Sequence, residues 1–386
     1  MSSDIERYSE KSVTLNCNTF YMSLKCGIIG VANVGKTALF NCLSNTRAET
    51  SRFAFTSSRS NVGLINVPDN RLYQLAGIIK QENVIPATVE IVDIPGLTRG
   101  SSHGEGVGNK FLADIRNTDA LIHVLRCFDD DSLPHIDGTV DPVRDMETIR
   151  LELLIKDTES VDKKIEKVEK IARAGEKQAK HDLEVLQTYK EHLESFQPAR
   201  TMSVVEQDRL AVDDLFLLTD KPVLYVCNVD EASVVQGNKH VERVREALGE
   251  EDVEILVIAA RLEADIAELE DPEDRKAFLE DAGLSEPGAD RLVRSAYRML
   301  NLISFFTHNP KEVRAWTIER GTNVQRAART IHSDMERGFI RAEVIKFDDL
   351  YKLGSEHACK EAGRFFVEGK SYIVEDGDII YIRFNV

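Results

Sequence analysis

An eight-residue stretch, GVANVGKT, contains the residues whose types and spacing most clearly predict a reaction. It spans residues 30–37 and fits the pattern G-x-x-x-x-G-K-[ST]. Gly30 and Gly35 allow the backbone to curl so that its N–H groups converge on a β-phosphate. The Lys36 ammonium would reach the β- and γ-oxygens, and the Thr37 hydroxyl would bind Mg²⁺. A helix that begins there would add its positive dipole end, so the stretch predicts a phosphate-binding loop.

A second motif, DxxG, follows the apolar run TVEIVDI at residues 88–94. Asp93 at this place can hold Mg²⁺ through water, and the N–H of Gly96 can contact a γ-phosphate. Five glycines lie within residues 96–108, which favours a loop that reorders with the nucleotide state. The alternative is a long surface loop without a role.

The segment FTSSRSNVG, residues 55–63, lies where a switch loop would offer a hydroxyl to Mg²⁺. Thr56, Ser57 and Ser58 are all candidates, and composition does not choose between them.

The sequence NVDE at residues 228–231 bears on the base. Guanine-specific switches carry NKxD there, and the Asp carboxylate accepts two hydrogen bonds from guanine. Here Asn228 is present, but Val229 replaces Lys and Glu231 takes the fourth position, while Asp230 falls one position early. A displaced carboxylate loses a buried polar pairing, which can cost on the order of 10⁴–10⁵ in selectivity. The motif therefore favours adenine over guanine.

Residues next to these motifs indicate slow hydrolysis. Leu97 stands where many small GTPases have a Gln that orients the attacking water, and an aliphatic side chain does not hold water. Asn33 could help by binding a monovalent cation such as K⁺, or it could only brace the phosphate loop.

Short apolar runs that alternate with helical patterns must position these motifs. We expect strands at residues 24–30, 61–67, 88–94, 120–125, 222–228 and 253–259. Near-continuous apolar runs of this length are typical of a parallel sheet covered on both faces. The predicted fold class is therefore a doubly wound α/β domain.

Two further regions differ in texture. Between the fourth and fifth runs, apolar residues recur at spacings of three and four on both sides of Gly175, which predicts an antiparallel helical hairpin. Residues 156–200 contain ten basic and ten acidic residues, so the hairpin is either a solvated surface or a docking arm. Beyond Asn301, strand-like runs flank one helical pattern, which predicts a small α+β domain.

Composition limits the class of protein. The net charge of −17 opposes broad adhesion to nucleic acid or anionic membranes, and we expect no sequence-specific DNA binding. The six scattered cysteines form no CxxC pair, which favours reduced thiols in a cytoplasm. No apolar run approaches the roughly 18–20 residues of a membrane helix. Residues 1–21 lack the apolar region of a signal peptide, so we expect an unstructured extension or a misplaced start before Met22.

These motifs together resemble the Obg-like ATPases of the YchF type, a family of P-loop proteins in the translation-factor class. The resemblance runs from Leu24 to the C-terminus. It rests on NVGKT (33–37), NVG (61–63), VDIPGL (92–97), GEGVGNKFLADIR (104–116), RCF (126–128), N-x-x-E (228–231), EADIAEL (263–269), KEVRAWTI (311–318), IHSDMERGFIRAEVI (331–345) and the terminal EDGDIIYIRFNV.

The resemblance implies a P-loop G domain at residues 23–148 and 205–301, an inserted helical arm at 149–204 and a C-terminal TGS domain of β-grasp fold at 302–386, after an extension at 1–22. It also implies a preference for ATP, with GTP accepted by some members, and association with ribosomes in translation or stress control.

The resemblance also implies roles for single residues. The stretch Asn33, Val34, Gly35, Lys36, Thr37 and Ala38 would wrap the phosphates. Val229, beside Asn228, would meet adenine through its backbone. His123 matches a histidine proposed in the family to replace the missing Gln, whereas its spacing alone would make it a core histidine.

This sequence departs from the family in its switch segment. The family usually has Pro where Ala32 stands, and C-T-I-E-P-N-V-G where residues 56–63 read TSSRSNVG. The Mg²⁺ threonine becomes Ser57, which keeps the oxygen ligand, and a Glu becomes Arg59, which reverses a charge in this loop.

Two functions follow. One is a slow ATP-hydrolysing switch that acts on the translation machinery. The other is a nucleotide-gated binding protein in which the C-terminal domain and the arm act and hydrolysis is incidental.

Overall fold

The computed structural model describes residues 24–44, 60–96, 107–249 and 251–385. Within these ranges, six strands form the first sheet. In sheet order they are β2 (Asn61–Asn66), β4 (Thr88–Asp93), β1 (Lys25–Ile29), β5 (Ala120–Arg126), β6 (Val223–Asn228) and β7 (Ile255–Ile258). Each strand falls within an apolar run that the sequence analysis expected, apart from one residue at the end of β5. The expected extension at the N-terminus lies outside the described residues.

The first sheet is not wholly parallel, in contrast to the expectation. Strands β1, β4, β5, β6 and β7 pair in parallel, but the edge strand β2 runs antiparallel to β4. Strands β2 and β4 are joined by a connection that returns the chain to the same edge, and this reverses its direction.

Helices cover both faces of this sheet. They are α1 (Lys36–Ser44), α3 (Val107–Arg116), α4 (Pro142–Arg173), α7 (Lys239–Leu248), α8 (Ala260–Glu268), α9 (Pro272–Asp281) and α10 (Gly288–Met299). Tyr225 and Cys227 of β6 cluster with α7, whereas Leu224 and Val226 cluster with α1 and α10. Because alternate side chains of a strand point to opposite faces, these helices lie on opposite sides of the sheet.

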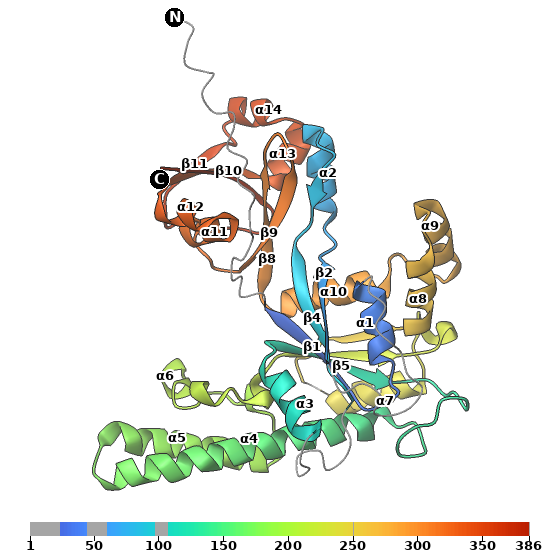
Figure 1. Ribbon diagram of the computed structural model, residues 1–386, viewed down its shortest axis with the longest axis vertical. Coiled ribbons are helices and arrows are strands. Elements are labelled where there is room, and N and C mark those ends of the chain that lie inside the picture. The colour runs from blue at the N-terminus through green and yellow to red at the C-terminus, as the bar shows by residue number, and fades with distance from the viewer. Residues whose placement is uncertain (1–23, 45–59, 97–106, 250, 386) are drawn as a thin grey trace, which may run out of the picture.

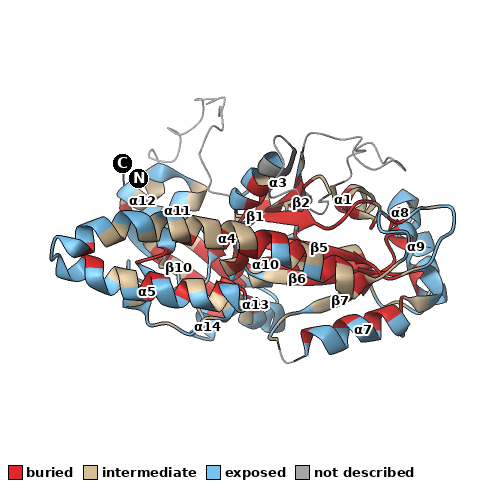
Figure 2. Cartoon of the chain, turned by 90° about the horizontal axis from the view of Figure 1, so that it is seen from below, coloured by how far each residue is buried: buried red, intermediate tan, exposed pale blue. Residues whose placement is uncertain are grey.

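The arm is an antiparallel pair of helices (Figure 1). Helix α4 begins at Pro142, where the Asp141 carboxylate caps two N–H groups, and it runs unbroken from the sheet into the arm. Gly175, with φ +94°, makes the turn into α5 (Lys177–Glu194). Short helical segments bring the chain back to β6: η1 (Ala199–Thr201), α6 (Glu206–Arg209), η2 (Asp213–Leu215) and η3 (Leu218–Asp220). Figure 2 shows buried residues concentrated on the strands and exposed ones along the arm.

A second sheet lies in the C-terminal region. Its order is β11 (Phe366–Glu368), β10 (Phe339–Lys346), β12 (Asp378–Phe384), β8 (Leu302–His308), β9 (Val313–Glu319) and β3 (Val84–Ile85). The helices of this region are α11 (Val324–Ile331), α12 (Ser333–Arg337), α13 (Phe347–Leu353) and α14 (Glu356–Glu361). The last strand, β12, lies parallel to the first, β8, and α11 packs on the sheet, which is the β-grasp arrangement.

No helix in the described ranges is long and apolar enough to cross a membrane.

Candidate nucleotide-binding site

The loop between β1 and α1 needs glycine at two positions. A Cβ at Gly35, where φ is +96°, would lie 2.3 Å from the Asn228 Nδ2 atom. A Cβ at Gly30 would lie 2.6 Å from the Val124 carbonyl oxygen. At these two positions the loop packs too closely on β5 and β6 to leave room for a side chain, as a backbone that cradles phosphates requires.

Lys36 lies inside this loop. Its Nζ atom donates a hydrogen bond to the Val31 carbonyl at 2.8 Å, and its side chain is buried. Burial lowers the pKa of Lys36 to about 8, and the Asp93 carboxylate opposes this shift. A Cβ added to Gly96 would lie 2.9 Å from this Nζ atom. Lys36 is therefore mostly cationic at neutral pH and lies against the glycine of the DxxG motif.

Thr37 and Asp93 meet at the end of β4. The Thr37 hydroxyl donates to Asp93 Oδ2 at 2.9 Å, and Asn61 Nδ2 lies 3.5 Å from the same oxygen. The other oxygen, Oδ1, is buried and has no hydrogen-bond partner among the described residues. Burial raises the pKa of the Asp93 carboxyl, while the Thr37 hydroxyl and the Lys36 charge oppose this rise. A hydroxyl beside an unsatisfied carboxylate oxygen fits hydrated Mg²⁺, which prefers oxygen ligands.

Asn228 fastens the phosphate loop to the sheet. Its Nδ2 donates to the Val34 carbonyl at 2.8 Å, and its Oδ1 accepts from the Ala260 N–H at 3.0 Å. Both ends of the amide are thus engaged between the loop and the start of α8. Asn228 therefore holds the backbone of the phosphate loop in place against the start of α8.

The rest of NVDE follows the end of β6. Val229 is buried, and its N–H donates to the Ile258 carbonyl at 2.9 Å. Glu231 is exposed and begins the short helix η4 (Glu231–Ser233). The Asp230 carboxylate accepts from the Ser233 N–H at 3.0 Å, so it caps η4, and both acids are exposed at this strand end.

Asn33 takes a left-handed backbone conformation, with φ +63°, at the tip of the phosphate loop. Its Nδ2 donates to the Pro134 carbonyl at 3.1 Å. Its amide oxygen is the atom that a monovalent cation would bind. Val34 is buried and Ala38 half-buried at the start of α1.

His123 lies within β5, where it pairs in register with Ile29 and Tyr225. It is buried, and its Nε2 atom has no hydrogen-bond partner among the described residues. Burial lowers the pKa of His123 to about 3, helped by the Lys36 charge, so the imidazole is neutral. The structure thus places His123 inside the sheet and not on a loop. Ser57 and Leu97 lie outside the described residues.

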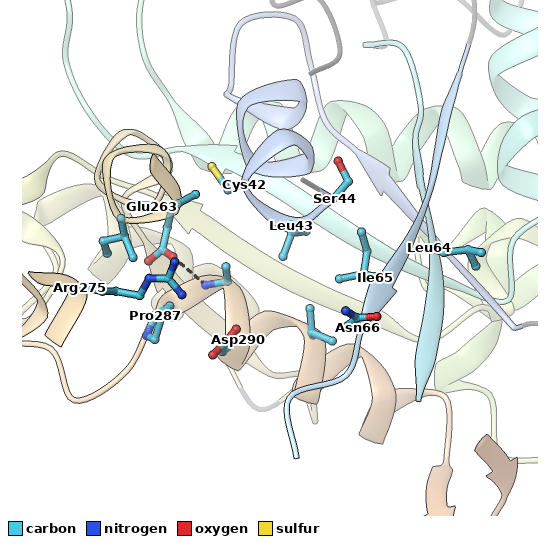
Figure 3. A pocket seen from close by; sticks show the side chains of 14 residues that line it. Cys42, Leu43, Ser44, Leu64, Ile65, Asn66, Glu263, Arg275, Pro287 and Asp290 are labelled. Carbon is cyan, nitrogen blue, oxygen red and sulfur yellow. Dashed lines mark hydrogen bonds between the residues drawn. The ribbon is translucent and has the colours of Figure 1, made fainter. Parts of the chain in front are cut away.

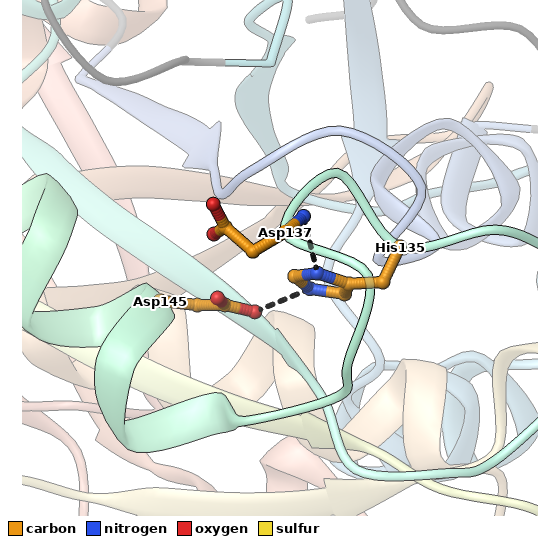
Figure 4. A group of neighbouring side chains, drawn as sticks. All are labelled: His135, Asp137 and Asp145. Atoms are coloured by element: carbon orange, nitrogen blue, oxygen red, sulfur yellow. Dashed lines mark hydrogen bonds and ion pairs between the residues drawn. The ribbon is translucent and has the colours of Figure 1, made fainter.

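Sequence reasoning missed the loop at residues 127–141 that supports Asn33. Its His135 is buried and lies 2.8 Å from the Asp145 carboxylate of α4, while the Asp137 N–H donates to the other ring nitrogen at 3.1 Å (Figure 4). These three side chains are close enough to hold a metal ion, but Arg144 donates to Asp145 at 3.3 Å and lies 3.4 Å from Asp137. The Arg144 guanidinium therefore already supplies the positive charge at this cluster. No spacing of residues in the sequence predicts the cluster.

A cavity of about 280 Å³ lies beside the end of α1, between β2, α8 and α10 (Figure 3). The Glu263 carboxylate at its edge accepts from the N–H groups of Gly288 and Ala289, at 2.7 and 3.0 Å. This carboxylate therefore caps α10, and it is satisfied by the protein itself.

Comparison with known proteins supports the geometry. A family model described as a 50S ribosome-binding GTPase matches residues 25–188, and one named YchF-GTPase_C, described as a protein of unknown function, matches residues 302–385. A Bacillus subtilis protein named ribosome-binding ATPase YchF is 45% identical, with 95% of this chain and 100% of that protein covered. The protein of the same name from Haemophilus influenzae is 44% identical over the same shares.

A solved structure, that of the Schizosaccharomyces pombe YchF GTPase, superposes with a TM-score of 0.83 at 32% identity, with 94% of this chain and 98% of that chain covered. The chain belongs to the YchF family.

Proposed function

We propose that this protein is a nucleotide-dependent switch that binds ATP with Mg²⁺, hydrolyses it slowly and acts on the ribosome in the cytoplasm. The contact between the Thr37 hydroxyl and Asp93, beside the buried Lys36, carries the proposal. The curated relatives named ribosome-binding ATPases match over their full lengths, which supports the reaction and the partner.

The chain's own groups divide the work. The backbone of Asn33–Ala38 wraps the phosphates, and the Lys36 ammonium neutralises charge that develops on the β- and γ-oxygens. Thr37 and Asp93, with Ser57 as a third proposed ligand, would hold Mg²⁺, and the ion would supply further positive charge to the phosphate groups. The Gly96 N–H would donate to the γ-phosphate.

The base would lie at the end of β6. Asn228 orients the loop, Val229 would offer its backbone carbonyl, since its N–H donates to Ile258, and Glu231 would take the place of the guanine-reading Asp. An adenine base loses nothing from the longer side chain, so we expect ATP to bind more tightly than GTP, with GTP as a weaker second nucleotide.

The burial of His123 favours a packing role over the catalytic one that the resemblance implies. His123→Gln separates the two roles. A catalytic role predicts a loss of kcat with an unchanged melting temperature, and a packing role predicts the reverse.

We also propose that Asn33 binds K⁺ and that this ion raises the rate of hydrolysis. Replacing K⁺ with Na⁺ tests this role. The hypothesis fails if turnover is unchanged, or if Asn33→Ala still responds to K⁺.

Release of phosphate from ATP tests the enzyme, and co-sedimentation with ribosomes tests the partner. We expect hydrolysis in the wild type and none above background in Lys36→Ala. The alternative is an adaptor in which hydrolysis is incidental. It predicts nucleotide-dependent ribosome binding that persists when hydrolysis is blocked by a non-hydrolysable analogue. If Lys36→Ala binds ribosomes as well as the wild type does, nucleotide does not gate ribosome binding.

A further inference from the structure

The connection between β2 and β4 leaves the first sheet and enters the second (Figure 1). After β2 the chain forms α2 (Asn70–Ile79) and then the two-residue strand β3, before β4 returns to the nucleotide site. Strand β3 pairs in parallel with β9 of the C-terminal sheet, with Val84 opposite Val313. One short connection therefore belongs to both sheets.

Polar contacts reinforce this junction. The Val313 N–H donates to the Asn83 carbonyl at 2.9 Å, and the Asn83 side chain donates to the Lys311 carbonyl at 3.2 Å. Gln81 Nε2 donates to the Asn309 carbonyl at 3.4 Å. Backbone and side chains both take part, so the connection is attached along its length and not at one point.

Arg71 of α2 makes the charged contact of the junction. Its guanidinium donates to both oxygens of Asp376, at 3.0 and 3.2 Å, and lies 5.6 Å from the centre of the Phe306 ring. Asp376 Oδ1 also accepts from the Ser304 N–H of β8 at 3.0 Å. A Cβ at Gly377, where φ is +89°, would lie 2.8 Å from the guanidinium. A two-bond arginine pair fixes direction as well as distance.

The other end of the same connection holds the proposed Mg²⁺ ligand. Strand β2 pairs with β4 from Asn66 opposite Thr88 to Asn61 opposite Asp93. The five steps from Thr88 to Asp93 span ~17 Å. A paired strand cannot slip by one residue without moving its buried side chains to the other face. This ladder therefore connects α2 and β3 to Asp93 through paired backbone of fixed register.

We propose that Arg71 is a positioning residue for Asp93, and that the junction of α2 and β3 links the nucleotide site to the C-terminal domain. The proposal rests on the proposed ATP hydrolysis. By linkage, nucleotide that fixes Asp93 also fixes the junction, and a partner that holds the C-terminal domain changes the affinity for Mg²⁺.

Steady-state ATP hydrolysis at a series of Mg²⁺ concentrations tests the proposal in the full chain. We expect Arg71→Ala and Asp376→Ala each to raise the half-saturating Mg²⁺ concentration by about fivefold or more, the lower end of measured couplings between sites, with kcat at saturation close to wild type. The matched control is Arg383→Ala, which removes a similar two-bond ion pair with Glu343 within the C-terminal sheet and should leave the Mg²⁺ dependence unchanged.

Arg71 also donates to Asp69, at 2.8 Å, so the charge is kept in a second variant, Arg71→Lys, which loses only the two-bond geometry and should raise half-saturation less than Arg71→Ala does. Half-saturation within twofold of wild type in both alanine variants overturns the proposal. A wild type that shows no Mg²⁺-dependent ATP hydrolysis overturns the proposed function instead.

A second measurement needs no variant, in case Arg71→Ala does not fold. Hydrogen exchange of the wild type is compared with and without Mg²⁺ and a non-hydrolysable ATP analogue. We expect slower exchange in peptides that cover residues 81–87 and 311–317. Unchanged exchange in both peptides, with protection at the phosphate loop, overturns the proposal.

Discussion

Two buried aspartates show how the nucleotide region differs from the C-terminal domain. Asp93 is 4% exposed and Asp378 is 1% exposed, and both end or begin a strand. Asp378 is fully engaged: Lys346 Nζ lies 2.8 Å from one oxygen, while the Tyr372 hydroxyl and the Glu375 N–H donate to the other at 2.7 and 2.9 Å. Asp93 has a donor on one oxygen only.

The difference separates a structural carboxylate from a ligand-binding one. A buried charge is stable only when its hydrogen-bonding capacity is filled. The protein itself fills that of Asp378, so this residue holds the C-terminal sheet together. The hydrogen-bonding capacity of Asp93 is filled only when a ligand supplies the missing partner. Without a ligand this carboxylate therefore destabilises the fold, as is typical of residues kept for function.

The largest expected effect is on hydrolysis in Asp93→Asn. This variant keeps the shape of the side chain but loses the negative charge that would hold hydrated Mg²⁺. We expect ATP turnover to fall on the order of 10²-fold, as when a group that stabilises transition-state charge is removed. Asp378→Asn is the matched control and should turn over ATP at the wild-type rate. Equal losses in both variants would remove the distinction.

Gly96→Ala sharpens the comparison at the neighbouring residue. Its Cβ would lie 2.9 Å from the Lys36 Nζ atom and 3.1 Å from the Ala32 nitrogen. Displacing the ammonium should lower kcat by about 10- to 100-fold, because small misplacements of reacting groups are costly. Gly369→Ala, where an added Cβ meets nothing within 4 Å, is the matched control, because neither glycine has a left-handed φ. Full activity of Gly96→Ala would place Lys36 elsewhere during the reaction.

The pH dependence follows from Lys36. Its pKa is lowered to about 8 in the folded protein, so the ammonium is lost as pH rises through 8. We expect kcat/KM for ATP, which reports the free enzyme, to fall about tenfold per pH unit above that value. The free energy of unfolding rises with pH over the same range, because the unfolded chain binds this proton more tightly than the folded protein does. A profile flat to pH 9.5 in the wild type would contradict the assignment.

The smallest effects concern stability. Asp378→Asn should lower the free energy of unfolding by about 1–3 kcal/mol, because it leaves the half-buried donors of Lys346 and Tyr372 poorly matched around a buried side chain. Asp93→Asn should leave the free energy unchanged or raise it, since burial raises the pKa of that carboxyl and so disfavours its charge. Urea denaturation measures both. Destabilisation of Asp93→Asn by as much as Asp378→Asn would mean that both aspartates are structural.

Local patterns predicted the first sheet well. Its six strands fall in apolar runs, because strands buried on both faces are apolar throughout. The direction of β2 was missed, because a short apolar run has no signal for parallel or antiparallel pairing. Strand β3 was missed because two residues show no periodicity, and its partner β9 lies more than 200 residues away.

The site was predictable where a motif carries its own geometry. The phosphate loop and DxxG predict a hydroxyl and a carboxylate near one Mg²⁺, and Thr37 and Asp93 lie in contact. The contacts of Asn228 with Val34 and of Asn33 with Pro134 were not predicted, since they depend on how distant loops pack. The strand position of His123 was predicted, but its role was not, because its residue type and spacing suit both a core and a catalytic histidine.

The most direct test of the ATP-using switch is the affinity of the wild type for ATP and GTP, each with Mg²⁺, measured by calorimetry beside the double variant Val229→Lys, Glu231→Asp. The account predicts that the wild type binds ATP more tightly and that the double variant gains affinity for GTP. A wild type that binds GTP more tightly than ATP would contradict it.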